Sequence, residues 1–160
     1  MRNLAEHSFS DSPAVRPYQC IEISQLKVSA YKIPTETPEA DGTYDWDSTT
    51  IVIAEVTAGG KKGLGYTYAD SATAKLIEDK LKKVVVGNDA MSVQATWLAM
   101  LRSIRNLGRS GICAMAISAV DTSLWDLKAR LLDLPVVTLL GQVRDALPIY
   151  GSGGFTNYSN

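Results

Sequence analysis

Few residues of this chain have the types and spacing that catalysis requires. The sequence holds one histidine, His7, in a polar N-terminal segment. One histidine excludes a metal site built from several histidines, and a Ser-His-Asp triad would require that segment to fold back onto the domain. Ser110 and Ser152 have no neighbouring base, and no two carboxylates are spaced for acid–base catalysis. A small hydrolase that uses either serine is therefore the weakest functional hypothesis.

Two aromatic pairs are better candidates, as binding residues rather than catalytic ones. Tyr44 and Trp46 lie in the segment 34–50, which contains two prolines, a glycine and five acidic residues without a basic one. We interpret this segment as a loop, either solvated or a mobile lid, because long loops inside small domains are often functional. Tyr66 and Tyr68 lie two residues apart on a predicted strand and so share one face, either for sheet packing or for contact with a substrate.

Ligand motifs elsewhere in the chain are incomplete. The run GSGG at 151–154 does not complete the G-x-G-x-x-G pattern of a dinucleotide-binding loop. The run GGKKGLG at 59–65 lacks the spacing of a phosphate-binding loop and is typical of a hairpin turn. A calcium loop that starts at Asp41 would need glycine at its sixth position and glutamate at its twelfth, where the chain has Trp46 and Val52.

The composition is that of an ordinary globular domain. The 160 residues carry 16 basic and 17 acidic side chains, a net charge of −1, so nothing indicates a nucleic acid or an anionic membrane as partner. No apolar run reaches the roughly 18–20 residues of a membrane span, and no signal peptide is evident, so we expect a soluble, cytoplasmic protein. Cys20 and Cys113 are too few for a four-cysteine zinc site; two buried reduced thiols are expected, with a disulfide as the alternative.

The spacing of apolar residues predicts a three-stranded antiparallel meander followed by helices. Strands are expected at 20–33, with a slip in register near Ser24–Gln25, and at 50–58 and 64–69; helices are expected at 71–85, 89–107, 112–131 and 135–140. A last short strand is expected at 147–150. On the helix 112–131, Asp126 falls away from the apolar stripe and is interpreted as a solvated charge, whereas Asp121 lies at the edge of that stripe and could cap or pair inside the fold.

The third long helix and the residues after it carry a family resemblance. AISAVDTSLWDLKARLLDLPVVTLLG at 116–141, followed by LPIYGSGG at 147–154, resembles the domain junction of the enolase superfamily, in its mandelate racemase / muconate lactonizing enzyme branch. The matching residues are Ala116, Ala119, Asp121, Leu124, Trp125, Asp126, Arg130, Pro135, Val136, Leu139, Leu140, Gly141, Tyr150 and Ser152. Ser123 departs from the alanine of the family pattern. With the meander and helices in the same order, the resemblance covers about residues 20–158.

The resemblance implies an α+β fold in three parts. Residues 1–19 would be a flexible arm, and residues 20–145 would be the N-terminal capping domain, a three-stranded antiparallel meander followed by a helical bundle. Residues 146–160 would be the first strand and loop of an incomplete (β/α)7β barrel. A full barrel takes about 250 residues, so we expect this chain to represent the N-terminal part of a longer enzyme.

The family's chemistry is the removal of the proton α to a carboxylate, with a bound Mg²⁺ stabilising the enediolate. The resemblance implies a small carboxylate or acid-sugar substrate, and racemisation, loss of water or cycloisomerisation as the outcome. In the family, the segments equivalent to 34–50 and to about 66–71 close over the substrate. The substrate-binding candidates are therefore Tyr44, Trp46, Tyr66, Tyr68 and Ser152.

The family's catalytic and metal-binding residues lie on later barrel strands. We therefore expect this chain alone to have no catalytic residue and no metal site, and to be inactive. The leading hypothesis is the N-terminal part of an acid-sugar dehydratase or racemase. The alternative is a non-catalytic interaction module that associates with a barrel partner or with further copies of itself, and it predicts an exposed apolar face.

Overall fold

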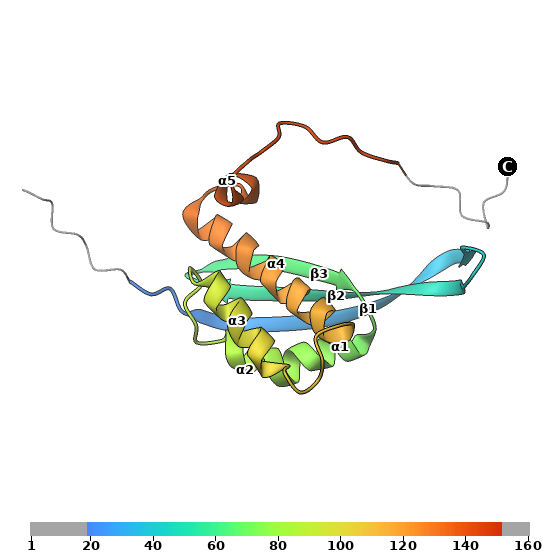
Figure 1. The fold of residues 1–160 in the computed structure, drawn as a ribbon, viewed down its shortest axis with the longest axis horizontal. Helices are drawn as coiled ribbons and strands as arrows, with labels where there is room; N and C mark the ends of the chain where they lie inside the picture. Colours follow the sequence, from blue (N-terminus) through green and yellow to red (C-terminus); the bar gives the residue numbers. More distant parts are fainter. Residues whose placement is uncertain (1–18, 152–160) are drawn as a thin grey trace, which may run out of the picture.

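One three-stranded antiparallel sheet, covered by helices on one face, organises residues 19–151, which a computed structural model describes (Figure 1). The strands follow chain order, β1-β2-β3. The elements are β1 (Ile23–Ala40), β2 (Asp45–Ala58), β3 (Lys61–Tyr68), α1 (Ser71–Leu76), η1 (Ile77–Leu81), α2 (Lys82–Val85), α3 (Val93–Ser103), α4 (Ile112–Leu132) and α5 (Val136–Leu140). None of these helices is long and apolar enough to cross a membrane.

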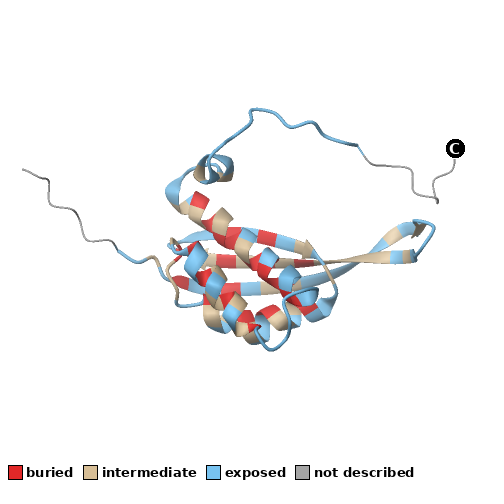
Figure 2. Cartoon of the chain, in the orientation of Figure 1, coloured by how far each residue is buried: buried red, intermediate tan, exposed pale blue. Residues whose placement is uncertain are grey.

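The alternation of side chains along β2 sets the two faces of the sheet. Val52, Ala54, Val56 and Ala58 are buried against the helices, whereas the residues between them point to the opposite face. The turn from β2 to β3 uses Gly59 and Gly60, both with positive φ, as the sequence indicates. The predicted slip in β1 is confirmed as a register shift between Ile23 and Gln25. Figure 2 shows the buried residues gathered between sheet and helices.

The helical layer agrees with the predicted order and differs in detail. The predicted helix 71–85 is one run whose middle turn, η1, is π-helical, and Asp70 caps its start by accepting the Ala72 N–H at 2.8 Å. The second helix is shorter than predicted, Val93–Ser103. No side chain caps its start; the Asp89 carboxylate, which lies before the helix, accepts the N–H groups of Ile21 and Met91, both at 3.2 Å.

Helix α4 lies directly on β3, and two glycines allow this approach. A Cβ at Gly63 would lie within 2.1 Å of the Ser123 carbonyl oxygen, and one at Gly65 within 2.0 Å of the Ala119 carbonyl oxygen. The prediction that Asp126 of α4 is only a solvated charge is wrong. Its Oδ2 accepts the Leu64 N–H at 2.8 Å and pairs with Arg130 Nε at 2.9 Å, because α4 crosses beside the unpaired edge of β3 and its backbone donor.

Two other expectations need correction. The cysteines are both free, but Cys20 is exposed and only Cys113 is buried. The strand expected at 147–150 is absent from the described residues, where Leu147 and Ile149 are exposed and form no ladder. A strand requires a hydrogen-bonded neighbour, and within 19–151 this segment has none.

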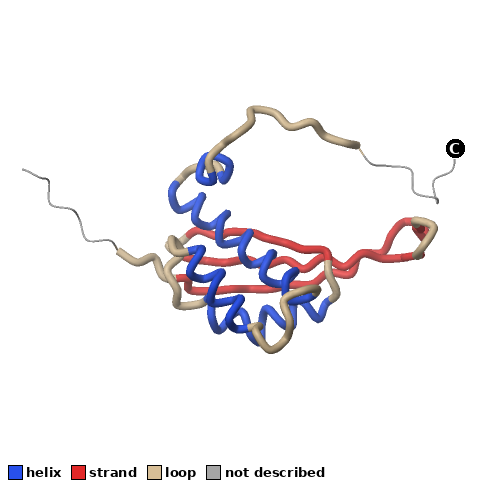
Figure 3. The backbone as a smooth tube through the Cα atoms, viewed as in Figure 1, coloured by secondary structure: helices blue, strands red, loops and turns tan. Residues whose placement is uncertain are grey.

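The segment 34–50, expected to be a loop, is for the most part a β-hairpin. The β1–β2 ladder continues beyond the helical layer, with pairs up to Ala40 and Asp45, and only residues 41–44 form the turn (Figure 3). The prolines that suggested a loop lie at an irregularity in the ladder between Pro34 and Glu39, where an edge strand tolerates a missing donor. We call residues 34–50 the arm; this segment is distinct from the N-terminal residues 1–19.

Candidate substrate-capping site

The turn of the arm is closed by one carboxylate. Asp41 Oδ1 accepts the N–H groups of Thr43 and Tyr44, at 2.9 and 3.0 Å, and the Thr43 hydroxyl at 2.6 Å. These hydrogen bonds, that of the Thr43 hydroxyl first, hold the pKa of the Asp41 carboxyl below its usual value of 3.8. Gly42, with φ of 88°, supplies the left-handed backbone that the turn requires. The turn thus fixes the position from which the Tyr44 side chain projects.

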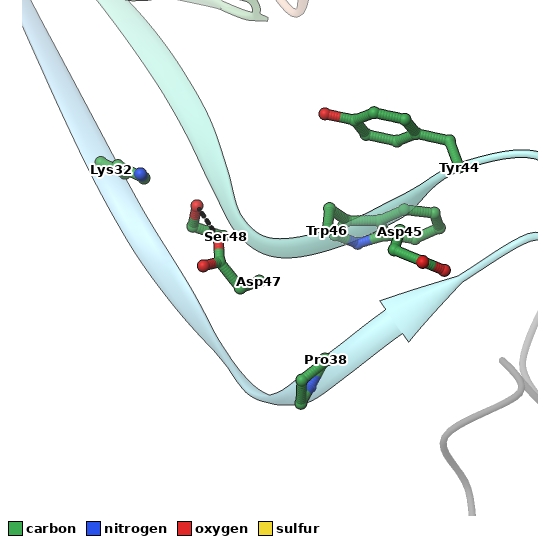
Figure 4. A pocket seen from close by; sticks show the side chains of 7 residues that line it. All are labelled: Lys32, Pro38, Tyr44, Asp45, Trp46, Asp47 and Ser48. Atoms are coloured by element: carbon green, nitrogen blue, oxygen red, sulfur yellow. Dashed lines mark hydrogen bonds between the residues drawn. The ribbon is translucent and has the colours of Figure 1, made fainter.

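Tyr44 and Trp46 form a stacked pair beside this turn. Their ring centroids are 6.3 Å apart with an interplanar angle of 14°. The indole N–H of Trp46 donates to Glu39 Oε2 at 2.7 Å across the ladder. Figure 4 shows the two rings one above the other, on the same side of the arm. Tyr44 remains 70% exposed, so the pair presents an aromatic surface to whatever approaches the arm.

An open hollow of about 440 Å³ joins the arm to the end of β3. Tyr44 and Trp46 line it from the arm, and Tyr68 and Asp70 line it from the end of β3 and the start of α1. The Ala69 N–H donates to the Thr50 carbonyl oxygen at 3.2 Å, which ties the two segments together at their base. The hydroxyls of Ser48, Thr49 and Thr50 complete the lining.

The structure therefore brings together three of the five predicted binding residues. Tyr44, Trp46 and Tyr68 share the hollow. Tyr66 does not line it and instead contacts Tyr68 edge-on, with ring centroids 6.2 Å apart. Ser152 lies outside the described residues. The two chain segments that meet are separated by about twenty residues, and the antiparallel ladder is what brings them into contact.

A second hollow, of about 450 Å³, lies along the arm (Figure 4). It is lined by Lys32, Pro38, Tyr44, Asp45, Trp46, Asp47 and Ser48. The Ser48 hydroxyl donates to Asp47 Oδ1 at 2.8 Å. One ammonium and two carboxylates on a solvent-facing surface can form hydrogen bonds with a polar ligand, but strong binding there would require the water to be excluded.

Neither hollow has the groups that a metal ion needs. Within residues 19–151, no three or more His, Cys, Asp or Glu side chains lie together so as to hold a cation. Burial raises the pKa of the half-buried Asp121 carboxyl above 3.8, but Asp121 lines neither hollow. The described residues can contact a ligand on an open surface; they do not fit a magnesium ion.

Two residues that shape this site were not among the predicted ones. Glu39 accepts the Trp46 indole N–H, and Asp41 closes the turn. The dipeptide Asp41–Gly42 is a strong hairpin signal and could have revealed the turn, because residues with strand propensity flank it. Nothing in the sequence indicates that Glu39 lies opposite Trp46, since that pairing depends on the register beyond the irregularity.

Comparison with known proteins identifies the family. Residues 25–141 match the model of the mandelate racemase / muconate lactonizing enzyme N-terminal domain. The chain is similar to 3,6-anhydro-alpha-L-galactonate cycloisomerase of Streptomyces coelicolor, with 32% identity over 82% of this chain and 38% of the relative. The chain thus spans under two fifths of that relative's length.

Two solved structures share the fold. A mandelate racemase/muconate lactonizing enzyme-like protein from Rubrobacter xylanophilus is 53% identical, with a TM-score of 0.82 over 86% of this chain and 38% of that one. L-talarate/galactarate dehydratase from Salmonella typhimurium LT2, liganded with Mg and L-lyxarohydroxamate, is 30% identical, with a TM-score of 0.68 over 85% and 39% of the two chains. The chain belongs to the mandelate racemase / muconate lactonizing enzyme branch of the enolase superfamily.

Proposed function

We propose that this chain is the capping part of a Mg²⁺-dependent acid-sugar dehydratase or racemase. In this proposal the arm and the end of β3 close over a carboxylate substrate. The observation that carries the proposal is the hollow in which Tyr44, Trp46 and Tyr68 meet, because these residues come from the two segments that the family resemblance assigns to the substrate. The names of the Streptomyces and Salmonella relatives, a cycloisomerase and a dehydratase of sugar acids, support the substrate class.

The hollow suits a polyhydroxylated acid. The aromatic faces of Tyr44 and Trp46 would cover the C–H side of the carbon chain, and the hydroxyls of Ser48 and Thr50 and the Asp70 carboxylate would hydrogen-bond to its hydroxyl groups. The hollow is open to solvent on its own, so enclosure would come from closing against the rest of the enzyme. Closure would expel water from the reacting carboxylate and so strengthen the electrostatic interactions in the site.

The magnesium ion and the groups that move protons belong elsewhere in this proposal. Magnesium, when bound, would stabilise the negative charge that develops on the substrate carboxylate. Residues 19–151 offer no ligand set for it, so these residues contribute substrate contacts and exclusion of water. The 160 residues alone are therefore expected to give no turnover.

The first test concerns the aromatic pair, in the enzyme that contains this chain. We expect Trp46→Ala to lower kcat/KM for the best sugar-acid substrate by about 10- to 100-fold, the range expected when a group that positions the substrate is lost. Tyr68→Ala should have a similar effect. The activity would be followed as formation of the keto acid that results from loss of water, or as loss of optical rotation for a racemase.

Leu98→Ala is the matched control, because Leu98 is an exposed apolar residue of α3 that lines neither hollow. It should leave kcat/KM within about twofold. If Trp46→Ala and Tyr68→Ala behave like Leu98→Ala on every sugar acid that the enzyme turns over, the arm does not contact the substrate and the capping role is wrong.

The alternative, a non-catalytic module that binds a separate barrel partner, is compatible with the same structure. The apolar side chains of α5 and the residues after it are exposed: Val137, Leu140, Val143, Leu147 and Ile149. A barrel in the same polypeptide or in a separate one would cover them equally well. Turnover of a sugar acid by the polypeptide that contains this chain, without an added partner, would exclude the alternative.

A further inference from the structure

The hollow between the arm and the end of β3 is charged in one sense only. Among the described residues that line it, Asp70 is the one charged residue, and none is a lysine, an arginine or a histidine. Asp70 is exposed and lies at the start of α1, where its Oδ1 accepts the Ala72 N–H at 2.8 Å. This hydrogen bond holds the carboxylate in place, so a ligand in the hollow meets a fixed negative charge.

The arm adds further negative charge and no positive charge of its own. It has no basic residue, and its acidic residues are Glu36, Glu39, Asp41, Asp45 and Asp47. Hydrogen bonds fix two of these carboxylates beside the aromatic pair: Glu39 accepts the Trp46 indole N–H at 2.7 Å, and Asp41 accepts the Tyr44 N–H at 3.0 Å. Side chains of this type are ordinarily ionised at neutral pH, so the arm presents an anionic surface.

Lys32, the basic residue nearest the arm in the sequence, does not reverse this balance. It lines the second hollow together with Asp45 and Asp47, as Figure 4 shows. One ammonium group against two carboxylates leaves that hollow negative as well. Lys32 does not line the first hollow. An anionic group would therefore meet an excess of negative charge in either hollow.

The uncharged residues of the first hollow favour the same kind of ligand. Tyr44 and Trp46 are stacked, and the face of an aromatic ring carries partial negative charge. Such a face attracts C–H groups and repels a carboxylate. The hydroxyls of Ser48, Thr49 and Thr50 can both donate and accept hydrogen bonds, as the hydroxyl groups of a sugar require. The lining thus fits a neutral polyhydroxylated chain better than an anionic group.

We propose that this hollow selects sugar acids whose far end is neutral, such as a hydroxymethyl group, over sugar diacids whose far end is a second carboxylate. The inference rests on the proposed function, in which bound magnesium offsets the charge of the reacting carboxylate. Residues 19–151 offer no ligand set for that ion, so the hollow receives the rest of the carbon chain. A second carboxylate would lose water beside Asp70 without a cation from the described lining, and burying an unpaired charge is unfavourable.

Coulomb's law gives the size of the expected effect. Two carboxylates about 6 Å apart repel each other by a factor of roughly 3 in an equilibrium constant at the dielectric constant of water, and by roughly 100 at the value typical of a protein surface. Closure of the site moves the hollow from the first condition toward the second. A preference of at least about tenfold for the neutral far end is therefore expected from Asp70 and the arm together.

The test compares matched substrates with the enzyme that contains this chain. The panel consists of sugar monoacids and the diacids of the same configuration, for example gluconate with glucarate and galactonate with galactarate. In each pair that is turned over, kcat/KM should be at least about tenfold higher for the monoacid. This difference should narrow as the salt concentration rises from about 10 mM to about 300 mM, because ions screen the repulsion as the diacid approaches.

Asp70→Asn removes the charge from the hollow and keeps a side chain that caps helices equally well. It should raise kcat/KM for the diacid relative to the monoacid by about 3- to 10-fold. A purely structural disturbance would lower both values alike, so the ratio separates charge from folding. Asp133→Asn is the matched control, because Asp133 is an exposed carboxylate at the C-terminal end of α4, which lies at the opposite end of the sheet from the arm (Figure 1). It should leave the ratio unchanged.

Three outcomes would overturn the inference. A diacid with kcat/KM equal to or above that of its matched monoacid would do so and leave the proposed function intact, since a cation from elsewhere in the enzyme would then bind the far carboxylate. A ratio that Asp70→Asn changes no more than Asp133→Asn does would show that the charge of the hollow does not select the substrate. Turnover of no sugar acid would contradict the proposed function itself, and this inference with it.

Discussion

At the scale of single residues, the contact between β3 and α4 leaves no space for a side chain. A Cβ at Gly65 would lie 2.0 Å from the Ala119 carbonyl oxygen and 2.7 Å from the Ser123 nitrogen, and both are backbone atoms of a helix that cannot yield locally. We therefore expect Gly65→Ala to lower the free energy of unfolding by about 2–4 kcal/mol, somewhat above the usual cost of overpacking. Urea unfolding would measure it.

The control for this prediction is Gly151→Ala. Gly151 has no heavy atom within 4 Å of an added Cβ, and its φ lies outside the left-handed region, so the substitution should change the free energy of unfolding by less than about 0.5 kcal/mol. Equal effects of the two substitutions would contradict the close approach of α4 to β3.

The same contact between α4 and β3 contains Ser123, the one departure from the family's pattern on α4. It is buried and its hydroxyl donates to the Val120 carbonyl oxygen at 2.6 Å, so the extra oxygen is satisfied without a new partner.

Asp41 gives a second prediction at this scale, concerning pH. Its carboxyl pKa is lowered in the folded chain, mainly by the Thr43 hydroxyl, so the charged form stabilises the turn of the arm. That contribution is fully present above the unfolded value of 3.8 and is lost as the pH falls through the lower folded value. An NMR titration should therefore find Asp41 titrating below 3.8. Thr43→Val removes the hydroxyl donor and should move the Asp41 pKa back toward 3.8; an unchanged pKa in that variant would contradict the assigned cause.

At the scale of elements, local patterns predicted some parts of this fold and not others. Helix α4 was predictable because its apolar residues recur at helical spacing for five turns and stay buried. The arm was misread as a loop because prolines and acids are depleted in strands on average, whereas an edge hairpin exposed to water tolerates both. The strand expected at 147–150 shows the opposite error: its residues suit a strand, but strand formation depends on a neighbour that no local pattern reveals.

The candidate site was also predictable from the sequence only in part. The aromatic residues were identified from type and position, and register then determined which of them meet: Tyr68 joins Trp46 in one hollow, whereas Tyr66, two residues earlier on the same face, does not. The hydrogen bond from Trp46 to Glu39 lies beyond the irregularity in β1, where pairing resumes five residues later on β1 but only two residues earlier on β2. Such an offset is set by the geometry of the turn and the twist of the two strands, which sequence spacing alone does not provide.

At the scale of the whole molecule, stability should decline outward from the sheet–helix core. Val52, Val56 and Leu124 are at most 1% exposed at the centre of that core, whereas the ladder of the arm is exposed to water and residues 142–151 form no ladder or helix (Figure 2). Amide hydrogen exchange should therefore be slowest in the central part of β2 and in α4, by on the order of 10³-fold or more relative to 142–151, which should exchange at nearly unstructured rates.

The same measurement should show intermediate protection in the arm. In a monomer its amides should exchange at intermediate rates, because hydrogen bonds in a two-stranded ribbon open easily without a core behind them. Protection of 142–151 that matches the core would contradict this gradient, because it would mean that these residues pack against the domain.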